Sequence, residues 1–357
     1  MHPGGIVTLA DTLAAQHVVV VAGSGGVGKT TSSAALAIAL AQRGRRVCVL
    51  TVDPARRLAT ALGLDLDEGT ARTVAGPWSG ELTAVQLDAG RTFDGLLERY
   101  GGSPDAISAI RRNPIYRSLA GALGGTQEYM AVERVYELSN SGHYDVVVID
   151  TPPTRNAVDL LDAPDRLLGF LSHGIVRALL APTKVSLRAA SLATAAAPRT
   201  IGSVVGTDLV NDVVSFFQAF ASLHQGFIDR ARAVQELLAD DATAYVLVTT
   251  PRGDALEETR WFSDQLTQRN LRTTGVIVNR VHPSFTTLDP EHLPLAGGVL
   301  GAHLDNLRDM ERAARRDRAA VSVLTGQDPN VLVAEIPWRA DPLTDIDALS
   351  DVATSYL

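Results

Sequence analysis

Residues 17–31 read HVVVVAGSGGVGKTT, and this stretch determines which fold the rest of the chain can adopt. Residues 17–22 are a β-branched run that stops at glycines, which is typical of a buried strand in a parallel sheet. A glycine-rich loop follows, and residues 29–42 then carry alanine and leucine at helical spacing. Residues 46–52 (RVCVLTV) predict a second strand. The fold therefore begins with a strand–loop–helix–strand unit.

The alternation of strands and helices continues along the chain. Further apolar runs predict strands at residues 81–87, 144–149, 244–249, 274–278 and 331–336. This pattern predicts the α/β class, with a doubly wound, mainly parallel sheet. Residues 163–242 lack a comparable run and are rich in alanine and leucine, so we expect a helical insertion subdomain there. The core would then comprise residues 1–162 and 243–357.

The loop at residues 23–30 satisfies the pattern G-x-x-x-x-G-K-[ST]. A triphosphate needs converging backbone N–H donors, and glycines let the chain wrap closely around it. The next helix directs its positive end at the phosphates, Lys29 would reach the β- and γ-phosphates, and the Thr30 hydroxyl would bind Mg²⁺. The candidate nucleotide-binding residues of the loop are Gly25, Gly26, Val27, Gly28, Lys29, Thr30 and Thr31.

A dinucleotide site is the rival interpretation of this loop. The loop also satisfies G-x-G-x-x-G, and Asp53 follows the second strand, where a dinucleotide fold places its ribose-binding acid. Such a site has no use for Lys29 and Thr30, nor for a second acid at a later strand end. Asp150 is such an acid, because it follows the apolar run YDVVVI, and a P-loop enzyme holds its Mg²⁺ shell at that place. The sequence therefore favours a nucleoside triphosphate.

Three strand ends carry further candidates, each with two interpretations. Asp53 either orients the attacking water or caps a helix over residues 58–62. The segment DTPPT, which begins at Asp150, is either a turn or a segment that senses the γ-phosphate. Asn279, followed by Arg280, either pairs with an adenine edge or satisfies backbone groups. The eight histidines lack ligand spacing, so no catalytic metal other than Mg²⁺ is indicated.

Composition excludes several classes of protein. The chain has 357 residues, of which 46% are hydrophobic and 20% charged, as in globular proteins with an ample core. Its net charge of −8 argues against a general binder of nucleic acid or membrane surfaces. The lone cysteine, Cys48, excludes an intrachain disulfide framework. The N-terminus lacks the basic start and apolar run of a secretory signal, so we expect a cytoplasmic location.

Taken together, the motifs resemble the ArsA/Get3 group of deviant P-loop ATPases, which belongs to the same class as MinD and ParA-type proteins. In that group, the segments that match Asp53–Ala55 and Asp150–Thr154 are the two switch regions. The resemblance extends from about residue 15 to residue 350. The matching segments are Gly25–Thr31, Asp53–Ala55, Gly125–Glu128, Asp150–Thr154 and Val278–Arg280.

The resemblance implies a cytosolic ATPase that uses ATP and Mg²⁺ and works as a dimer, with the two P-loops facing each other. Hydrolysis would open and close the dimer, and the helical insertions would present a surface to a protein client or membrane partner. Carried over by position, Lys29 binds phosphate, Thr30 binds Mg²⁺ and Asp53 orients water. Asp150 would support the Mg²⁺ shell through water, and Asn279 would read adenine.

Departures from the family pattern qualify these expectations. The signature lysine of the loop, which reaches the partner's phosphates, is replaced by Ser24. The family's arsenite-binding and zinc-bridging cysteines have no counterparts, so neither arsenite pumping nor a zinc-clamped dimer is expected. Ser24 suggests a heterodimer with a lysine-bearing paralogue, unless Arg56, Arg57 or Arg155 supplies the charge. The alternatives are a weakly hydrolysing ATP-binding scaffold and a ParA/MinD-like positioning ATPase.

Overall fold

The structure is a computed structural model, and it describes residues 7–100, 104–113, 126–180, 207–221, 223–325, 331–341, 343 and 345–357. The chain divides into two compact units. The first contains Met1–Leu87, Glu137–Val158 and Ala239–Leu357, and the second contains Asp88–Tyr136 and Asp159–Leu238. The second unit thus includes residues on both sides of β5, whereas the sequence pattern predicts an insertion only at residues 163–242.

The first unit is built on an eight-stranded sheet with the order β3-β4-β2-β5-β1-β6-β7-β8. Every pairing is parallel except the one between β3 and β4. The predicted doubly wound, mainly parallel sheet is therefore confirmed. The strands are β1 (Val18–Gly23), β2 (Arg46–Thr51), β3 (Ala71–Thr73), β4 (Glu81–Gln86), β5 (Val146–Asp150), β6 (Thr243–Thr249), β7 (Thr273–Val281) and β8 (Leu332–Pro337).

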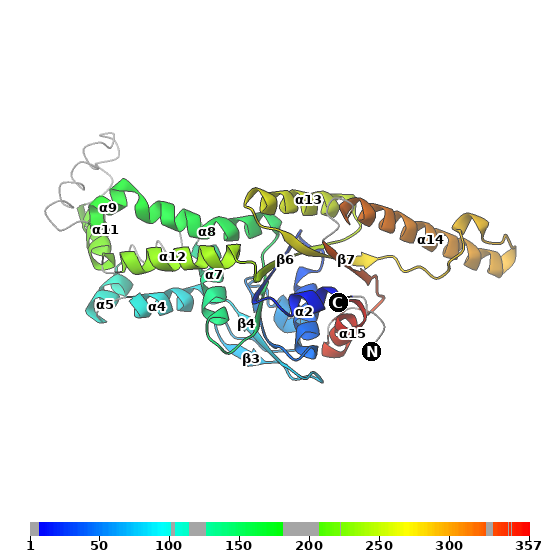
Figure 1. Ribbon diagram of the computed structural model, residues 1–357, viewed down its shortest axis with the longest axis horizontal. Coiled ribbons are helices and arrows are strands. Elements are labelled where there is room, and N and C mark those ends of the chain that lie inside the picture. Colours follow the sequence, from blue (N-terminus) through cyan, green and yellow to red (C-terminus); the bar gives the residue numbers. More distant parts are fainter. Residues whose placement is uncertain are drawn as a thin grey trace. The chain divides into compact units, whose positions relative to one another are not determined.

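Helices cover both faces of this sheet, which is why its central strands are almost wholly apolar. In Figure 1, α2 and α15 lie on one side of the strands and α13 and α14 on the other. The α2 helix packs against the central strands, and all its alanines and leucines are buried. The helices of this unit are α1 (Leu9–Leu13), α2 (Lys29–Gln42), α3 (Arg57–Ala61), the 3₁₀ turn η1 (Pro290–His292), α13 (Gly253–Gln268), α14 (Gly298–Thr325) and α15 (Ile346–Tyr356).

The described part of the second unit is helical. A cluster of phenylalanines lies in its interior, with the rings of Phe220 and Phe227 5.1 Å apart. Phe216 and Phe217 are likewise buried. The helices that contribute to this unit are α4 (Ala89–Tyr100), α5 (Pro104–Arg112), α7 (Thr126–Ser139), α8 (Thr154–Ser172), α9 (Gly174–Leu180), α11 (Thr207–Phe220) and α12 (His224–Ala239).

Among the described residues, no helix combines the length and the apolar character that spanning a bilayer requires.

Candidate functional site

The carboxyl ends of the central strands meet at one edge of the sheet, and the predicted site residues lie there. β1 occupies the middle, between β5 and β6, and leads into the glycine loop. Asp150 ends β5, Asp53 follows β2 by two residues, and Asn279 lies near the end of β7. In open α/β sheets, the crevice outside these strand ends is the usual ligand site.

The glycine loop adopts backbone conformations that require glycine. Gly26 and Gly28 have φ values of 82° and 96°. A Cβ atom at Gly28 would lie 2.3 Å from the amide nitrogen of Asn279, so a larger residue would displace that side chain. Gly28 is also the N-cap of α2 and contributes no side-chain cap, which leaves the first N–H groups of the helix free to bind an anion.

Lys29 is held inside the loop that precedes it. Its Nζ donates a 2.9 Å hydrogen bond to the carbonyl oxygen of Ser24, and the residue is buried. Burial lowers the pKa of Lys29, and the neighbouring Asp150 carboxylate acts in the opposite direction. The amine is thus already positioned within the concave loop, where it can contact phosphate oxygens.

Asp150 is buried among hydroxyl groups. Its carboxylate accepts hydrogen bonds from Thr30 at 2.8 Å, Thr51 at 3.1 Å and Ser33 at 3.4 Å. Burial raises its pKa to about 6, although the Thr30 and Thr51 hydroxyls and Lys29 act to lower it. The carboxylate is only 1% exposed, so its negative charge would be stabilised by a cation. Mg²⁺ is typically held by one or two carboxylates together with substrate phosphates, and Thr30 and Asp150 fit that donor set.

Sequence reasoning missed Thr51 and Ser33. Thr51 is the direct partner of Asp150 in the pairing of β2 with β5, so its role depends on which strands are neighbours. Ser33 lies one helical turn after Thr30, a spacing that places both hydroxyls on the same face of α2. The helical spacing could have identified Ser33, whereas no local signal identifies Thr51.

Asp53 lies just before a bend in the chain rather than at a helix cap. One carboxylate oxygen accepts a 2.9 Å hydrogen bond from the N–H of Ala55, and the other lies 3.5 Å from Arg57. The N-cap of α3 is Arg56, with φ of 42°, so the alternative that Asp53 caps this helix is wrong. The Asp53 side chain remains 25% exposed and can therefore still accept a hydrogen bond from water.

Asn279 joins β7 to the glycine loop. Its amide nitrogen donates to the carbonyl oxygen of Val27 at 2.8 Å, and its amide oxygen accepts from the N–H of Arg280 at 2.9 Å. Both ends of this buried amide therefore contact the protein's own backbone, and its role in reading adenine stays a prediction. Arg280 itself is exposed and has a left-handed backbone, with φ of 62°.

A cavity of about 390 Å³ brings most of the predicted residues together. Val27, Asp150 and Asn279 are not among its lining residues, although Val27 lines the second cavity described next. A second cavity of about 360 Å³ shares Gly25, Gly26 and Arg280 with the first and is also lined by Ser24. The residues that line the first cavity are Gly25, Gly26, Gly28, Lys29, Thr30, Thr31, Asp53, Ala55, Arg57, Thr60, Ala61, Thr151, Pro153, Arg280 and Leu343.

Some residues of the predicted motifs are not found at this site. Gly125 and the Arg155 side chain are outside what the structure describes. Gln127 and Glu128, from the same predicted motif as Gly125, belong to α7 in the second compact unit.

Comparison with known proteins gives a consistent result. The family model of the anion-transporting ATPases matches residues 16–291. An uncharacterized protein of Streptomyces coelicolor is 30% identical over 275 residues, which are 75% of this chain but only 63% of that protein, less than two thirds of its length. ATPase get3 of Aspergillus niger is 28% identical over 73% of this chain and 72% of its own. ATPase GET3 of Paracoccidioides lutzii is 26% identical over 74% of this chain and 72% of its own.

Proposed function

The chain belongs to the anion-transporting ATPase family, and from that premise we propose that it binds ATP with Mg²⁺ and hydrolyses it to drive changes in a dimer. One observation carries the proposal most directly. The hydroxyl of Thr30 and the buried carboxylate of Asp150 are hydrogen-bonded at 2.8 Å, and Lys29, the neighbour of Thr30, is buried in the glycine loop. This is the donor set that a Mg²⁺–triphosphate requires.

In this proposal each residue has a separate role. Lys29 and the N–H groups at the start of α2 bind the phosphates, while Thr30 binds Mg²⁺ and Asp150 supports its water shell. Asp53 orients the attacking water through its partly exposed carboxylate. Asn279 fixes the loop through Val27 and holds Arg280 beside the bound nucleotide.

The dimer, its client and its location form the less direct part of the proposal. Two copies face each other across their glycine loops in the cytoplasm, and the helical unit contacts a protein client or a membrane partner. The second subunit is either an identical chain or a paralogue. Ser24 supplies no cation, and this favours a paralogue that carries lysine at this position. No nucleic acid is required, which separates the proposal from a ParA-type positioning ATPase.

The test is phosphate release by the purified chain, with ATP and with Mg²⁺ or EDTA. We expect Mg²⁺-dependent turnover that Lys29→Ala lowers by at least ~100-fold. Ser24→Lys should raise the turnover of the lone chain, since it restores a cation at the dimer face. Full activity of the lone chain, unchanged by Ser24→Lys, would contradict the paralogue part of the proposal.

A matched pair of arginines tests what replaces the missing charge. Arg57 lines the first cavity, whereas Arg56 does not and lies 3.5 Å from Asp65. Arg57→Ala should therefore lower turnover, and Arg56→Ala should not. If the chain binds ATP tightly but all variants release phosphate as slowly as the wild type, the scaffold function replaces the hydrolase.

A further inference from the structure

Arg280 has a backbone conformation that few arginines adopt. Its φ of 62° lies in the left-handed region, which is uncommon for residues other than glycine. The pairing of β7 with β8 shifts its register between Asn279 and Val281, so Arg280 is the extra residue of a bulge. Bulges redirect side chains and are common beside functional sites, where unusual backbone conformations also gather. The departure from a regular strand therefore indicates that the direction of the Arg280 side chain has a function.

Hydrogen bonds hold the bulge in place on both sides. The N–H of Arg280 donates to the amide oxygen of Asn279 at 2.9 Å, and the amide nitrogen of Asn279 donates to the carbonyl oxygen of Val27 at 2.8 Å. One side chain thus joins the bulge to the glycine loop. The chain after the bulge is held as well, since the N–H of His282 donates to the carboxylate of Asp317 on α14 at 2.8 Å. The backbone of Arg280 is therefore fixed beside the glycine loop.

Arg280 belongs to both cavities beside the glycine loop. Gly25, Gly26 and Arg280 are the three residues that line the cavity of about 390 Å³ and also the cavity of about 360 Å³. The wall that the two cavities share thus consists of two loop glycines and one cation. The Arg280 side chain is exposed, so a ligand in either cavity can reach it.

The other two arginines that line these cavities already have carboxylate partners. Arg57 lies 3.5 Å from the carboxylate of Asp53. Arg252 pairs with Asp254 at 3.2 Å. In the part of the chain that the structure describes, the guanidinium of Arg280 has no such partner. Its charge is therefore available to an anion.

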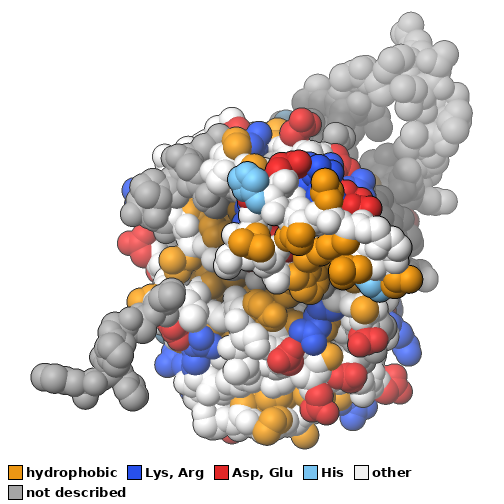
Figure 2. Space-filling view, turned by 90° about the vertical axis from the view of Figure 1, so that its right-hand side faces the viewer, with side chains coloured by type: hydrophobic (Ala, Val, Ile, Leu, Met, Phe, Trp, Pro, Cys, Tyr) orange, Lys and Arg blue, Asp and Glu red, His pale blue; other side chains and the backbone are white. Residues whose placement is uncertain are grey.

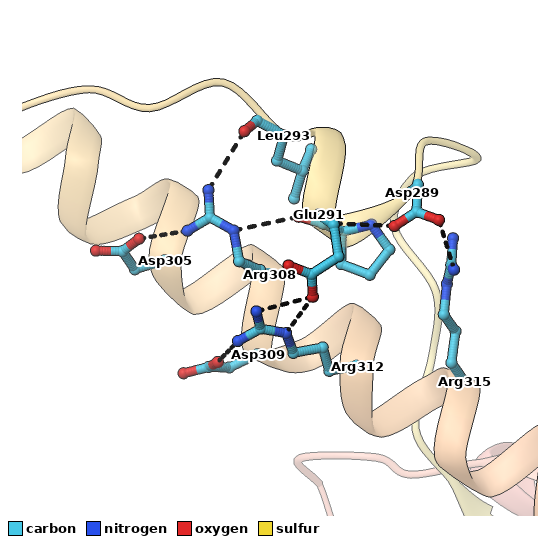
Figure 3. Close-up of polar contacts among 9 residues, drawn as sticks. Asp289, Glu291, Leu293, Asp305, Arg308, Asp309, Arg312 and Arg315 are labelled. Carbon is cyan, nitrogen blue, oxygen red and sulfur yellow. Dashed lines mark hydrogen bonds and ion pairs between the residues drawn. The ribbon is translucent and has the colours of Figure 1, made fainter.

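The arginines of the neighbouring helix α14 differ from Arg280 in this respect. Arg312 pairs with Glu291 at 2.8 Å (Figure 3). Arg315 pairs with Asp289 at 3.0 Å in the same view. Acidic and basic side chains are likewise interspersed on the face that Figure 2 shows. The charges of these two α14 arginines are neutralised locally and stabilise the fold, whereas the charge of Arg280 is not used in this way.

Hydrolysis of ATP develops negative charge that a fixed cation can stabilise. The oxygen of the attacking water forms a bond to the γ-phosphorus, and the bond from this phosphorus to the bridging oxygen breaks. The bridging oxygen keeps the electron pair, so the products are ADP, inorganic phosphate and a proton released to solvent. In phosphoryl-transfer enzymes an arginine beside these oxygens often stabilises the transition state.

We propose that Arg280 supplies this cation from the same chain: its guanidinium binds the phosphate oxygens of ATP and stabilises the charge that develops during hydrolysis. A guanidinium is planar and carries several N–H donors, which suits phosphate oxygens. Ser24, which lines the second cavity with Arg280, has no charge to contribute. The inference rests on the proposed function and bears on the second subunit, because a chain that carries its own cation can work with an identical copy.

Phosphate release by substituted chains tests the assignment. Arg280→Gly removes the guanidinium and suits the left-handed backbone, so turnover at saturating ATP should fall at least ~100-fold without a lower unfolding temperature. Arg252→Ala is the matched control, since it removes a paired arginine of the second cavity and should leave turnover unchanged. Unchanged turnover of Arg280→Gly overturns the inference, as does an equal loss in the control. A loss of turnover that comes with a lower unfolding temperature also overturns it, because the side chain would then support the fold.

A second set of variants tests whether the positive charge is what matters. Arg280→Lys keeps the charge and Arg280→Gln removes it from a side chain of similar length, so the lysine variant should retain more turnover. Ser24→Lys should raise the turnover of Arg280→Gly by a larger factor than that of the wild type, since a second cation matters more when the first is absent. Equal turnover of the first two variants, or equal factors in the two backgrounds, overturns the inference.

Nucleotide affinity separates a phosphate contact from a base contact. Displacement of a fluorescent ATP analogue measures how tightly ATP and GTP bind. Arg280→Gly should weaken both by the same factor, about 10-fold, because both carry the same phosphates. A loss for one nucleotide alone would identify a contact to the base and overturn the inference, and so would unchanged affinity for both.

The same measurements distinguish this inference from the proposed function. If Arg280→Gly hydrolyses ATP as fast as an active wild type, the inference fails and the proposed function stands. If the wild type binds ATP but releases no phosphate with Mg²⁺, the proposed hydrolysis fails. An equal loss of ATP and GTP affinity in Arg280→Gly would then still place Arg280 at the phosphates.

Discussion

Two buried carboxylates, one at the loop edge of the sheet and one on α14, have pKa values that move in opposite directions. Asp150 is 1% exposed and Glu311 is 2% exposed. Burial raises the pKa of Asp150 to about 6, because its partners are mainly neutral hydroxyls. Burial also acts to raise the pKa of Glu311, but two backbone N–H groups and the Ser284 hydroxyl outweigh it, and the pKa is lowered.

The difference distinguishes a structural carboxylate from a functional one. The fold itself satisfies the charge of Glu311, since backbone donors are fixed in place and bind the ionised form. The hydroxyl donors compensate the negative charge of Asp150 only in part, and a bound cation would complete that compensation. Burial and hydrogen-bond number alone would not separate the two residues, whereas the chemical type of the donors does.

The largest expected effect is on activity. Asp150→Asn keeps the size of the side chain but removes the charge that supports Mg²⁺, so Mg²⁺-dependent phosphate release should fall at least ~100-fold. The matched control is Asp145→Asn, which lies just before the other end of the same strand and pairs with Arg46 at 2.7 Å. If Asp150→Asn keeps turnover within a few-fold of the wild type, Asp150 is not a functional carboxylate and its distinction from Glu311 fails.

The second effect is on pH-dependent stability, measured by urea unfolding without nucleotide or metal. The pKa of Asp150 is higher in the folded state, so its stabilising contribution is present at low pH and is lost as the pH rises through about 6. The wild type should therefore lose on the order of 2–3 kcal/mol relative to Asp150→Asn between pH 4 and pH 7.5.

The same measurement on Glu311 should give the opposite slope. Its pKa is lowered on folding, so the stability that distinguishes the wild type from Glu311→Gln is present above pH 5 and decreases as the pH falls. Equal slopes for the two carboxylates would show that donor type does not separate them.

A smaller effect is expected from removing the Glu311 carboxylate entirely. Glu311→Ala leaves the N–H groups of Phe285 and Thr286 without their acceptor, and this should lower the free energy of unfolding by about 2 kcal/mol. Asp309→Ala is the control, because Asp309 is exposed and has a 3.5 Å ion pair with Arg312. Thermal or urea unfolding of the two variants, side by side, decides whether Glu311 fixes the backbone at Phe285 and Thr286 to α14.

The smallest effect belongs to a surface carboxylate. The Arg46 guanidinium and the N–H of Arg46 lower the pKa of Asp145 to about 2. Because such exposed pairs are screened by solvent, Asp145→Asn should destabilise the protein by less than about 1 kcal/mol at pH 7. The loss should shrink as the pH falls below 4, since the carboxylate is then protonated in the unfolded state and begins to be so in the folded state. A larger loss would mean that this surface ion pair contributes as much to the free energy of unfolding as the buried hydrogen bonds of Glu311.

Local sequence patterns predicted the sheet and most of the candidate residues that meet at its loop edge, and non-local contacts account for what they missed. The glycine loop, Asp53 and Asp150 are recognisable because each stands at the end of an apolar run. β3 was missed because its three residues are exposed and carry no apolar pattern. Thr51 acquires its role only from the neighbouring strand, and the bond from Asn279 to Val27 spans 252 residues. The exposure of Val299 and Leu300 was equally hidden, since large apolar residues on a helix normally predict burial.

The central place of β1 also has a consequence for how the protein is made. Val21 pairs with Asp150 on one side and with Val246 on the other, and the loop after β1 is fixed by Asn279. At synthesis rates of about 5–20 residues per second, the ribosome reaches Asn279 roughly 12–50 s after it has made the loop. A nascent chain therefore carries the phosphate-binding motif long before it has the strands that shape it. Nucleotide binding should become possible only late in translation, and it would report that the whole sheet has formed.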